Sequence, residues 1–282
     1  MNSTKIFCIL LIIILLFLLL CDKTSKNENY EQSKVFVLSY ENEGNHQHLK
    51  LLENKLKYYG YDYKILGEGE EWKGFGTKIK AYQNFIRETT LKDNDILIIL
   101  DARDVYVNRN SNEIEKVFED LYNSRGGDLD KNLKLVFSSE IGCCTPGLYD
   151  EEKEKMKNIA LKYKNMEHDD GSYYLNSGMI IGYIKAYKEI YLKFEMDLHD
   201  DDQTEMTKWW FNNNLDKIIL DYEQVLFTNA FVWGYADNLG GCPYERDENY
   251  NNQFVLKKTK ICPFFIQTPA KYWFCYNYLY GI

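Results

Sequence analysis

The run Ile96–Leu100 constrains the fold of this chain more than any other segment does. Its residues are all isoleucine or leucine, and an aspartate stands on each side of it, Asp95 and Asp101. A short apolar run of this kind is typical of a buried strand. Further runs of the same type predict strands at 35–40, 63–66, 133–137, 179–183, 218–220 and 264–266.

Segments with helical character separate these predicted strands. Their bounds are 48–59, 77–90, 114–122, 185–196 and 203–211, and Thr77 is the expected N-cap of the second helix. Strands that alternate with helices predict an α/β fold with a central, mainly parallel sheet. We expect one such domain at residues 34–282, with its ligands at the carboxyl ends of the strands.

The composition limits the partners of this domain. Aromatic residues make up 16% of the chain, and tyrosine alone contributes 24 of them, which indicates a folded rather than a disordered protein. The formal net charge is -9 at pH 7. Binding to phosphate backbones needs an excess of lysine and arginine, so we expect no nucleic acid as a partner.

An unbroken apolar run, Ile6–Cys21, precedes the predicted domain. Leucines at positions 18–20 stand where a cleaved signal peptide has small residues. The run is therefore interpreted as a signal anchor at residues 1–22, followed by a polar linker at 23–33. A cleaved signal peptide, or a lipoprotein signal ending at Cys21, is the alternative. The anchor predicts a membrane-bound, single-pass protein of the endoplasmic reticulum or Golgi, with its folded domain in the lumen.

The cysteines outside the apolar run leave two interpretations open. They show no Cys-x-x-Cys pair, which disfavours a structural zinc site. A disulfide between Cys242 and Cys262 suits a lumenal domain. Free, buried thiols fit the sequence equally well.

Two carboxylates follow the strongest predicted strand, in the segment Asp101-Ala102-Arg103-Asp104. Carboxylates that leave a buried strand are costly unless a positive charge meets them. Oxygen ligands suit Mg²⁺ or Mn²⁺, and such ions also bind diphosphates. The segment therefore predicts a metal site at Asp101 and Asp104, with a plain aspartate turn as the alternative.

Three further segments place polar residues at the ends of predicted elements. The segment 74–78 suits an anion at a helix N-terminus, 176–178 suits the hydroxyl groups of a sugar, and 200–202 suits a catalytic carboxylate. Each is also compatible with a purely structural role, as a loop into a helix, a turn, and the acidic first turn of a helix.

Taken together and in this order, the motifs resemble the glycosyltransferase domain of the procollagen lysyl hydroxylases and, more distantly, the collagen galactosyltransferases. The resemblance covers nearly all of residues 34–275. The residues that carry it are Glu70-Glu71-Trp72, Gly76, Thr77, Lys78, Asp101, Asp104, Phe137, Ser138, Glu140, Cys143, Leu175-Asn176-Ser177-Gly178 and Asp201-Asp202-Gln203.

The resemblance implies a GT-A fold and the transfer of a hexose from a UDP-sugar to a hydroxylysine-like or glycan acceptor. It also implies Mn²⁺ or Mg²⁺ bound by Asp101 and Asp104, with Asp201 and Asp202 as catalytic carboxylates. The donor-binding residues that it implies are Trp72, Gly76, Thr77, Lys78, Arg103, Asn176, Ser177 and Gly178.

Two positions depart from the family pattern. The third metal ligand of the family is a histidine near the C-terminus, and the comparable segment here is 264–269, in which Gln267 is the predicted replacement. Cys144 stands where the relatives have tryptophan. A non-catalytic relative that binds the donor or a glycan is therefore the alternative function. His-x-Asp pairs at 168–170 and 199–201 lie inside the transferase-like region, which disfavours iron-oxygenase chemistry.

Overall fold

The computed structural model describes residues 33–142, 150–163, 171–230, 242–269 and 273–282. Residues from Ser33 to Ile282 form one compact unit. The predicted anchor and nearly all of the linker lie outside the described residues, as do Cys143 and Cys144. Among the helices that the structure describes, none is long and apolar enough to cross a membrane.

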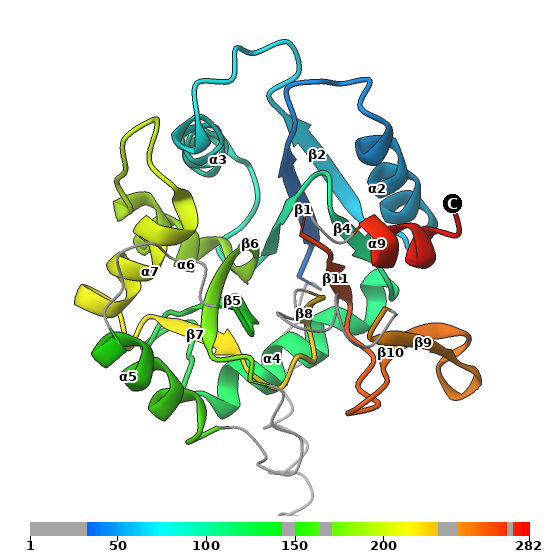
Figure 1. Ribbon diagram of the computed structural model, residues 1–282. Coiled ribbons are helices and arrows are strands. Elements are labelled where there is room, and N and C mark those ends of the chain that lie inside the picture. The colour runs from blue at the N-terminus through cyan, green and yellow to red at the C-terminus, as the bar shows by residue number, and fades with distance from the viewer. Residues whose placement is uncertain (1–32, 143–149, 164–170, 231–241, 270–272) are drawn as a thin grey trace, which may run out of the picture. The chain divides into compact units, whose positions relative to one another are not determined.

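The central sheet has the strand order β2-β1-β3-β6-β5-β7 (Figure 1). Its strands are β1 (Val35–Tyr40), β2 (Asp62–Leu66), β3 (Ile96–Asp101), β5 (Leu135–Glu140), β6 (Tyr174–Tyr183) and β7 (Ile218–Asp221). Strand β6 runs antiparallel to both of its neighbours, β3 and β5, whereas the other pairs are parallel. The sheet is thus mixed. The sequence did not indicate the direction of β6, because a continuous apolar run shows that a strand is buried but not in which direction it runs.

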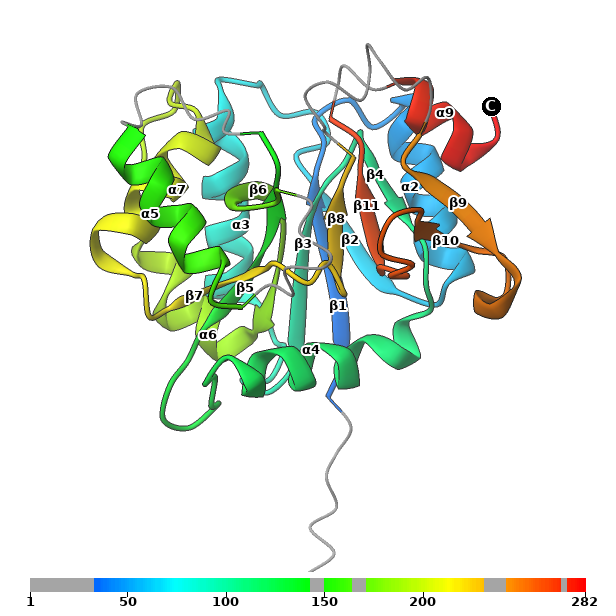
Figure 2. The ribbon, with the colours of Figure 1, turned by 60° about the horizontal axis from the view of Figure 1, so that its bottom comes forward.

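Helices cover both faces of this sheet. They are α2 (Gln47–Tyr58), α3 (Phe75–Glu88), α4 (Ile114–Ser124), α5 (Asp150–Ala160), α6 (Ile184–Glu189), α7 (Asp202–Asn213) and α9 (Trp273–Tyr280). Figure 2 shows α3, α5, α6 and α7 to one side of the strands, and α2 to the other.

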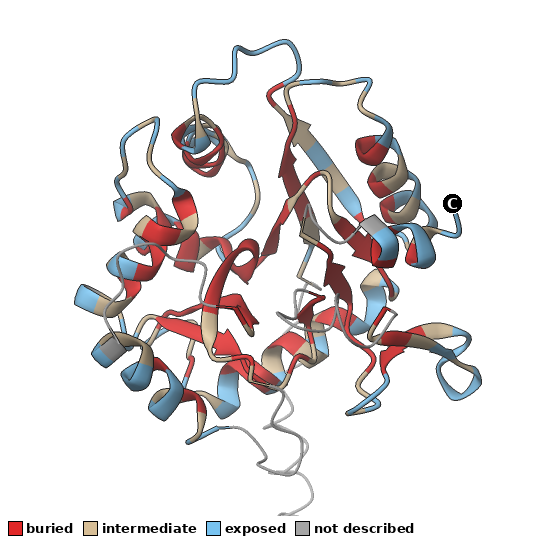
Figure 3. Ribbon diagram, in the orientation of Figure 1, coloured by how far each residue is buried: buried red, intermediate tan, exposed pale blue. Residues whose placement is uncertain are grey.

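Strand β3 explains why both faces are covered. Its side chains point alternately to opposite faces, so Leu97 and Ile99 join the core beneath α3, α6 and α7, while Ile96, Ile98 and Leu100 join the core beneath α2 and α4. All five residues are buried, and Figure 3 shows in red that most of the central sheet is buried as well. The prediction of a buried strand from this run is confirmed.

A smaller sheet, β4-β11-β8, lies next to the carboxyl end of β3 (Figure 1). Strand β11 (Phe265–Gln267) pairs antiparallel with β4 (Val105–Val107) and parallel with β8 (Phe227–Asn229). Its register sets Gln267 opposite Val105, one residue after Asp104. A separate hairpin consists of β9 (Tyr244–Asp247) and β10 (Gln253–Leu256).

Two helix predictions need correction. Helix α3 begins at Phe75 after the N-cap Gly74, so Thr77 lies inside the first turn and is not the cap. The helix predicted at 185–196 ends at Glu189 and is followed by a 3₁₀ turn at Tyr191–Lys193. This tighter turn still directs Tyr191 into the core, which is why helical spacing continued in the sequence.

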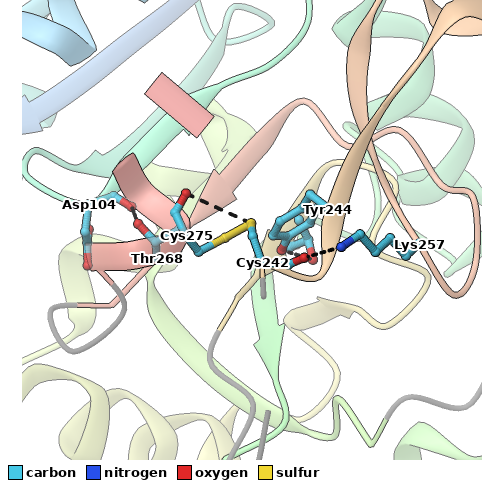
Figure 4. The surroundings of a disulfide bond; sticks show 7 residues. Asp104, Cys242, Tyr244, Lys257, Thr268 and Cys275 are labelled. Atoms are coloured by element: carbon cyan, nitrogen blue, oxygen red, sulfur yellow. Dashed lines mark hydrogen bonds between the residues drawn. A yellow bond between two sulfur atoms is a disulfide. The ribbon is translucent and has the colours of Figure 1, made fainter. Parts of the chain in front are cut away.

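The predicted cysteine pairing is also wrong. Cys242 is bonded to Cys275 in α9, and Cys262 is a free, buried thiol. Figure 4 shows this disulfide beside Asp104 and Thr268. The sequence does not distinguish Cys262 from Cys275, because the choice depends on where α9 packs. The disulfide ties α9 to the segment that enters β9, close to the end of β11.

Candidate functional site

The carboxyl ends of β1 and β3 open into a cleft of about 440 Å³. These strands are parallel neighbours, and their register sets Tyr40 opposite Asp101. The cleft is lined by Tyr40, Glu41, Asn42, Glu43, Trp72, Phe75, Lys78, Asp101, Ala102, Arg103 and Asp104. This is the edge of the sheet at which ligands were expected from the α/β pattern.

Asp101 and Asp104 converge on one amide nitrogen. Gln267 Nε2 lies 3.2 Å from Asp101 Oδ2 and 3.4 Å from each carboxylate oxygen of Asp104. The small sheet causes this meeting, because β11 returns the chain to β4 from 163 residues away. The three predicted metal-site residues therefore lie together.

The carboxyl group of Asp104 has an unusual environment. Burial, followed by the negative charge of Asp101, raises its pKa to about 7. The backbone carbonyl of Asp104 accepts bonds from both Thr268 N and Thr268 Oγ1, at 2.7 and 3.1 Å. These bonds hold the loop between β3 and β4 in place, and the loop in turn keeps the carboxyl groups of Asp101 and Asp104 close together.

Lys78 provides the nearest positive charge. Its Nζ lies 2.9 Å from Asp101 Oδ1 and 2.9 Å from Asp202 Oδ2. Burial by itself lowers the pKa of Lys78, but the carboxylates of Asp101 and Asp202 outweigh it and hold the pKa well above that of ordinary lysine. Lys78 is therefore a permanent cation within the site.

The glycines before Lys78 have a packing role. A Cβ at Gly76 would lie 2.7 Å from the backbone oxygen of Asp197 and from Leu198 Cα, and Gly76 N donates to Leu198 O. Thr77 Oγ1 accepts a bond from Lys73 N. Gly76 thus lets the segment before α7 approach α3 closely, which brings Asp202 to Lys78.

The two predicted catalytic aspartates differ in their surroundings. Asp201 is exposed and caps α7, since its Oδ1 accepts a bond from Thr204 N at 2.8 Å. Asp202 is buried and belongs to the Lys78 ion pair. The structural role expected for an acidic first turn holds for Asp201, while Asp202 faces the site.

Arg103 projects into the cleft but is already paired. Its guanidinium binds both carboxylate oxygens of Glu41, at 2.5 and 2.7 Å, and lies 3.4 Å from Glu43. The hydrogen bonds that Arg103 donates to Glu41, helped by the charges of Glu41 and Glu43, raise the pKa of Arg103. Arg103 would therefore have to exchange these partners in order to bind another anion.

Trp72 forms an aromatic wall of the cleft together with Tyr40 and Phe75. Its ring lies 5.9 Å from that of Tyr40 and 5.6 Å from that of Phe75. Trp72 is 43% exposed, so it is not a core residue. The three rings are inclined to one another, at 47° for Tyr40 and Trp72 and at 88° for Trp72 and Phe75, so the exposed Trp72 ring is the apolar surface that the wall offers to a planar ligand group.

Asn176, Ser177 and Gly178 lie within β6, not in a turn before it. The ladder with β5 pairs Phe137 with Ile180 but Ser138 with Asn176, so β6 bulges at this point. Gly178 N donates to Asn176 Oδ1, which is a local turn inside the strand. The turn-like composition thus produces a bulge that leans toward Gln267.

Glu140 is the site residue that motif reasoning left without a role. It is buried at the end of β5 and accepts bonds from Gln203 Nε2 at 2.7 Å and Asn176 Nδ2 at 3.0 Å. Asn229 Nδ2, at the end of β8, contributes a third contact at 3.4 Å. The position of Glu140 shortly after a predicted strand was the sequence signal that it belongs to the site. No feature of the sequence indicated that Asn229 contacts Glu140.

The two carboxylates of the site suit a divalent ion, whereas the amide of Gln267, as it is oriented, does not. The carboxylates of Asp101 and Asp104 lie close enough together to share an amide donor, and Mg²⁺ or Mn²⁺ commonly uses one or two carboxylates together with substrate phosphates. Gln267, however, presents an N–H group to them. Within the described part of the chain, no group of three or more His, Cys, Asp or Glu side chains is arranged to hold a metal.

The amino-acid sequence of the chain matches a family model of glycosyltransferase domains. The family described as "PLOD GT domain" matches residues 31–263, and the chain belongs to that family. The resemblance drawn from the motifs is thereby confirmed.

Among curated proteins, the mouse procollagen-lysine,2-oxoglutarate 5-dioxygenase 2 is 26% identical over 204 residues, which cover 68% of this chain and 24% of that protein. The multifunctional procollagen lysine hydroxylase and glycosyltransferase of Caenorhabditis elegans is 26% identical over 192 residues, which cover 64% of this chain and 24% of that protein. The chain thus spans about a quarter of the length of these relatives.

Among solved structures, mouse xyloside xylosyltransferase 1 aligns with 85% of this chain and 98% of its own, at 10% identity and a TM-score of 0.46.

Proposed function

We propose that this domain transfers a hexose from a UDP-sugar to a hydroxyl group of a protein or glycan, with a hydroxylysine-like acceptor as the family-based expectation. The observation that carries the proposal is the meeting of Asp101, Asp104 and Lys78 in a cleft with an aromatic wall. Opposite charges at one end suit a metal-bound diphosphate, and the aromatic wall suits a base. A GT-A-type fold is part of the same proposal.

The donor side of the site follows from the charges. Asp101 and Asp104 would hold a divalent ion, Mn²⁺ or Mg²⁺, and such an ion would supply positive charge to offset that of the departing diphosphate. Lys78 keeps its proton and adds a second positive charge beside Asp101. Trp72 lies at the rim of the cleft, where its ring is accessible to uracil.

The acceptor side contains carboxylates and amides. We propose that the acceptor hydroxyl binds near Asn176 and Ser177 in the β6 bulge, and that Asp201 and Asp202 act on it. Asp201 is the exposed carboxylate at the N-terminus of α7. Asp202 affects the acceptor indirectly, through its ion pair with Lys78.

The secretory lumen is the proposed location. The apolar run Ile6–Cys21 supports a membrane anchor, and the Cys242–Cys275 disulfide supports an oxidising compartment. A chain that lacks residues 1–22 should be soluble and folded. Aggregation of that chain under mild conditions contradicts the anchor.

Turnover of UDP-sugars is the direct test. The full chain should release UDP from one or more UDP-hexoses with added Mn²⁺, and a chelator should stop the release. Asp101→Asn and Asp104→Asn should abolish it while leaving the unfolding midpoint nearly unchanged. The alternative, a catalytically impaired relative, predicts binding of UDP with Mn²⁺ in calorimetry but no release. Absence of both release and binding overturns both functions.

A further inference from the structure

Gln267 fills the space between the two aspartates of the proposed metal site. Its side chain is buried, with 4% of its surface exposed. A Cβ at Gly178 would lie 2.3 Å from Gln267 Nε2 and 2.8 Å from Asp101 Oδ2. The absence of a side chain at Gly178 is therefore what allows the amide to reach Asp101.

The orientation of this amide follows from its partners. Among the residues that the structure describes, the hydrogen-bond partners of Gln267 Nε2 are acceptors, namely the carboxylate oxygens of Asp101 and Asp104. Gln267 Oε1 accepts a bond from Asn229 Nδ2 at 3.3 Å. If the amide were turned over, its oxygen would face carboxylate oxygens and its NH₂ group would face that of Asn229, so both contacts would be repulsive.

Glu140 determines the orientation of Asn229 in turn. An ionised carboxylate only accepts hydrogen bonds, and Glu140 Oε2 lies 3.4 Å from Asn229 Nδ2. Asn229 Nδ2 carries two hydrogens, which serve Glu140 and Gln267. The hydrogen bonds from Glu140 to Asp101 therefore fit together without conflict. Asn229 Nδ2 donates to Glu140 and to Gln267 Oε1, and Gln267 Nε2 donates to Asp101.

We propose that Gln267 is a hydrogen-bond clamp that competes with divalent ions for Asp101 and Asp104, and that Asn229 holds it in the competing orientation. A clamp donates N–H groups to the two carboxylates, so an ion has to displace it before both aspartates are available. A ligand glutamine acts in the opposite way, because its oxygen adds to the coordination of the ion. This inference rests on the metal site of the proposed function.

Binding of Mn²⁺ to the full chain without nucleotide separates a clamp from a ligand by the sign of the effect. Gln267→Met keeps most of the side-chain volume and removes the donor. A clamp predicts that Gln267→Met binds Mn²⁺ about five- to tenfold more tightly. The hydrogen bonds from the amide to the two carboxylates exist only in the metal-free state, so their removal destabilises that state and not the metal-bound one. Equal or weaker binding overturns the clamp.

The orientation is tested by a second variant with a matched control. The carboxylate introduced by Asn229→Asp accepts from Gln267 Nε2 and so turns Gln267 Oε1 toward Asp101. In that background, Gln267→Met should weaken Mn²⁺ binding. Asn176→Asp adds the same charge beside Glu140, which Asn176 contacts at 3.0 Å, without a bond to Gln267. In this control background Gln267→Met should still tighten binding, and the same sign in both backgrounds contradicts the orienting role of Asn229.

The same titrations separate this inference from the proposed metal site. Asp101→Asn should remove most Mn²⁺ binding in every background. If Mn²⁺ binds Asp101→Asn as tightly as the unchanged protein, the metal site of the proposed function is wrong. If Asp101→Asn loses Mn²⁺ while Gln267→Met does not gain it, only the clamp is wrong. Thermal melting of each variant shows whether a loss of binding reflects unfolding.

Discussion

Lys78 and Asp202 form an ion pair buried between the first turns of α3 and α7, with 2.9 Å between Nζ and Oδ2. Lys78 lies 2.9 Å from Asp101 as well, so the pair connects α7 to the proposed metal site. Exposed fractions of 10% for the Lys78 side chain and 6% for that of Asp202 leave little water to screen the charges.

Removal of one partner of this pair should destabilise the domain strongly. Lys78→Met leaves Asp202 buried without its cation, and we expect a loss of about 3 kcal/mol in the free energy of unfolding, measured with urea. Lys208→Met is the control, because Lys208 pairs with Glu205 on the surface of α7 and should change stability by less than about 1 kcal/mol. Equal losses in the two variants would show that burial of the Lys78 pair has no energetic consequence.

Gly76→Ala should displace the segment before α7. The added methyl group meets backbone atoms of Asp197 and Leu198 at 2.7 Å, which cannot rotate away. We expect a loss of about 2 kcal/mol in stability. Gly44→Ala is the matched control, since the three atoms nearest to its methyl group all belong to the flexible side chain of Glu68. A Gly76→Ala protein as stable as Gly44→Ala contradicts the packing role.

The raised pKa of Asp221 should make the stability of the domain depend on pH. Burial raises its pKa to about 7, although its carboxylate accepts bonds from the backbone N–H groups of Val225, Leu226 and Phe227. Because the folded-state pKa lies above the unfolded-state value of about 3.9, the contribution of Asp221 to stability is complete below that value. It is then lost as the pH rises toward 7.

Asp221→Asn measures this contribution. The free energy of unfolding of the unchanged protein, minus that of Asp221→Asn, should decrease between about pH 4 and pH 7 and level off above. Urea titrations at several pH values give this difference directly. A difference that grows over that range would show that the three backbone donors outweigh burial and lower the pKa.

The disulfide should contribute to stability through the unfolded state. Cys242 and Cys275 are separated by 33 residues, and a cross-link over such a loop is worth about 4 kcal/mol. The double change Cys242→Ala with Cys275→Ala should therefore lower the melting temperature and make it insensitive to reductant. Cys262→Ala removes the free thiol and should leave the response to reductant intact.

Trp72 should govern affinity for the nucleotide. Trp72→Ala removes an exposed stacking surface and should weaken UDP binding about tenfold, whereas Trp72→Phe should lose less than half of that in free energy. Calorimetry with saturating Mn²⁺ provides both values. Unchanged affinity in Trp72→Ala would place the base elsewhere than on the aromatic wall.

Local chemistry explains why much of the fold was predictable. The apolar run of β3 is continuous because both of its faces are covered, and residues at 48–59 show the spacing of a helix with one buried stripe. Family membership was predictable for a different reason, because the resemblance rested on several short motifs in order along this chain, such as the Asp101–Asp104 pair, and not on overall identity, which is 26% to the mouse relative.

Contacts between distant residues were decided by the tertiary structure. The antiparallel direction of β6, the pairing of Cys242 with Cys275 and the bond from Gln267 to Asp104 all join segments far apart in sequence. The sequence by itself determined which residues are polar, apolar or acidic, and hence the elements and the chemistry available to them. Only the folded chain decided that the Gln267 nitrogen faces the aspartates, because hydrogen-bond direction depends on every partner that surrounds an amide.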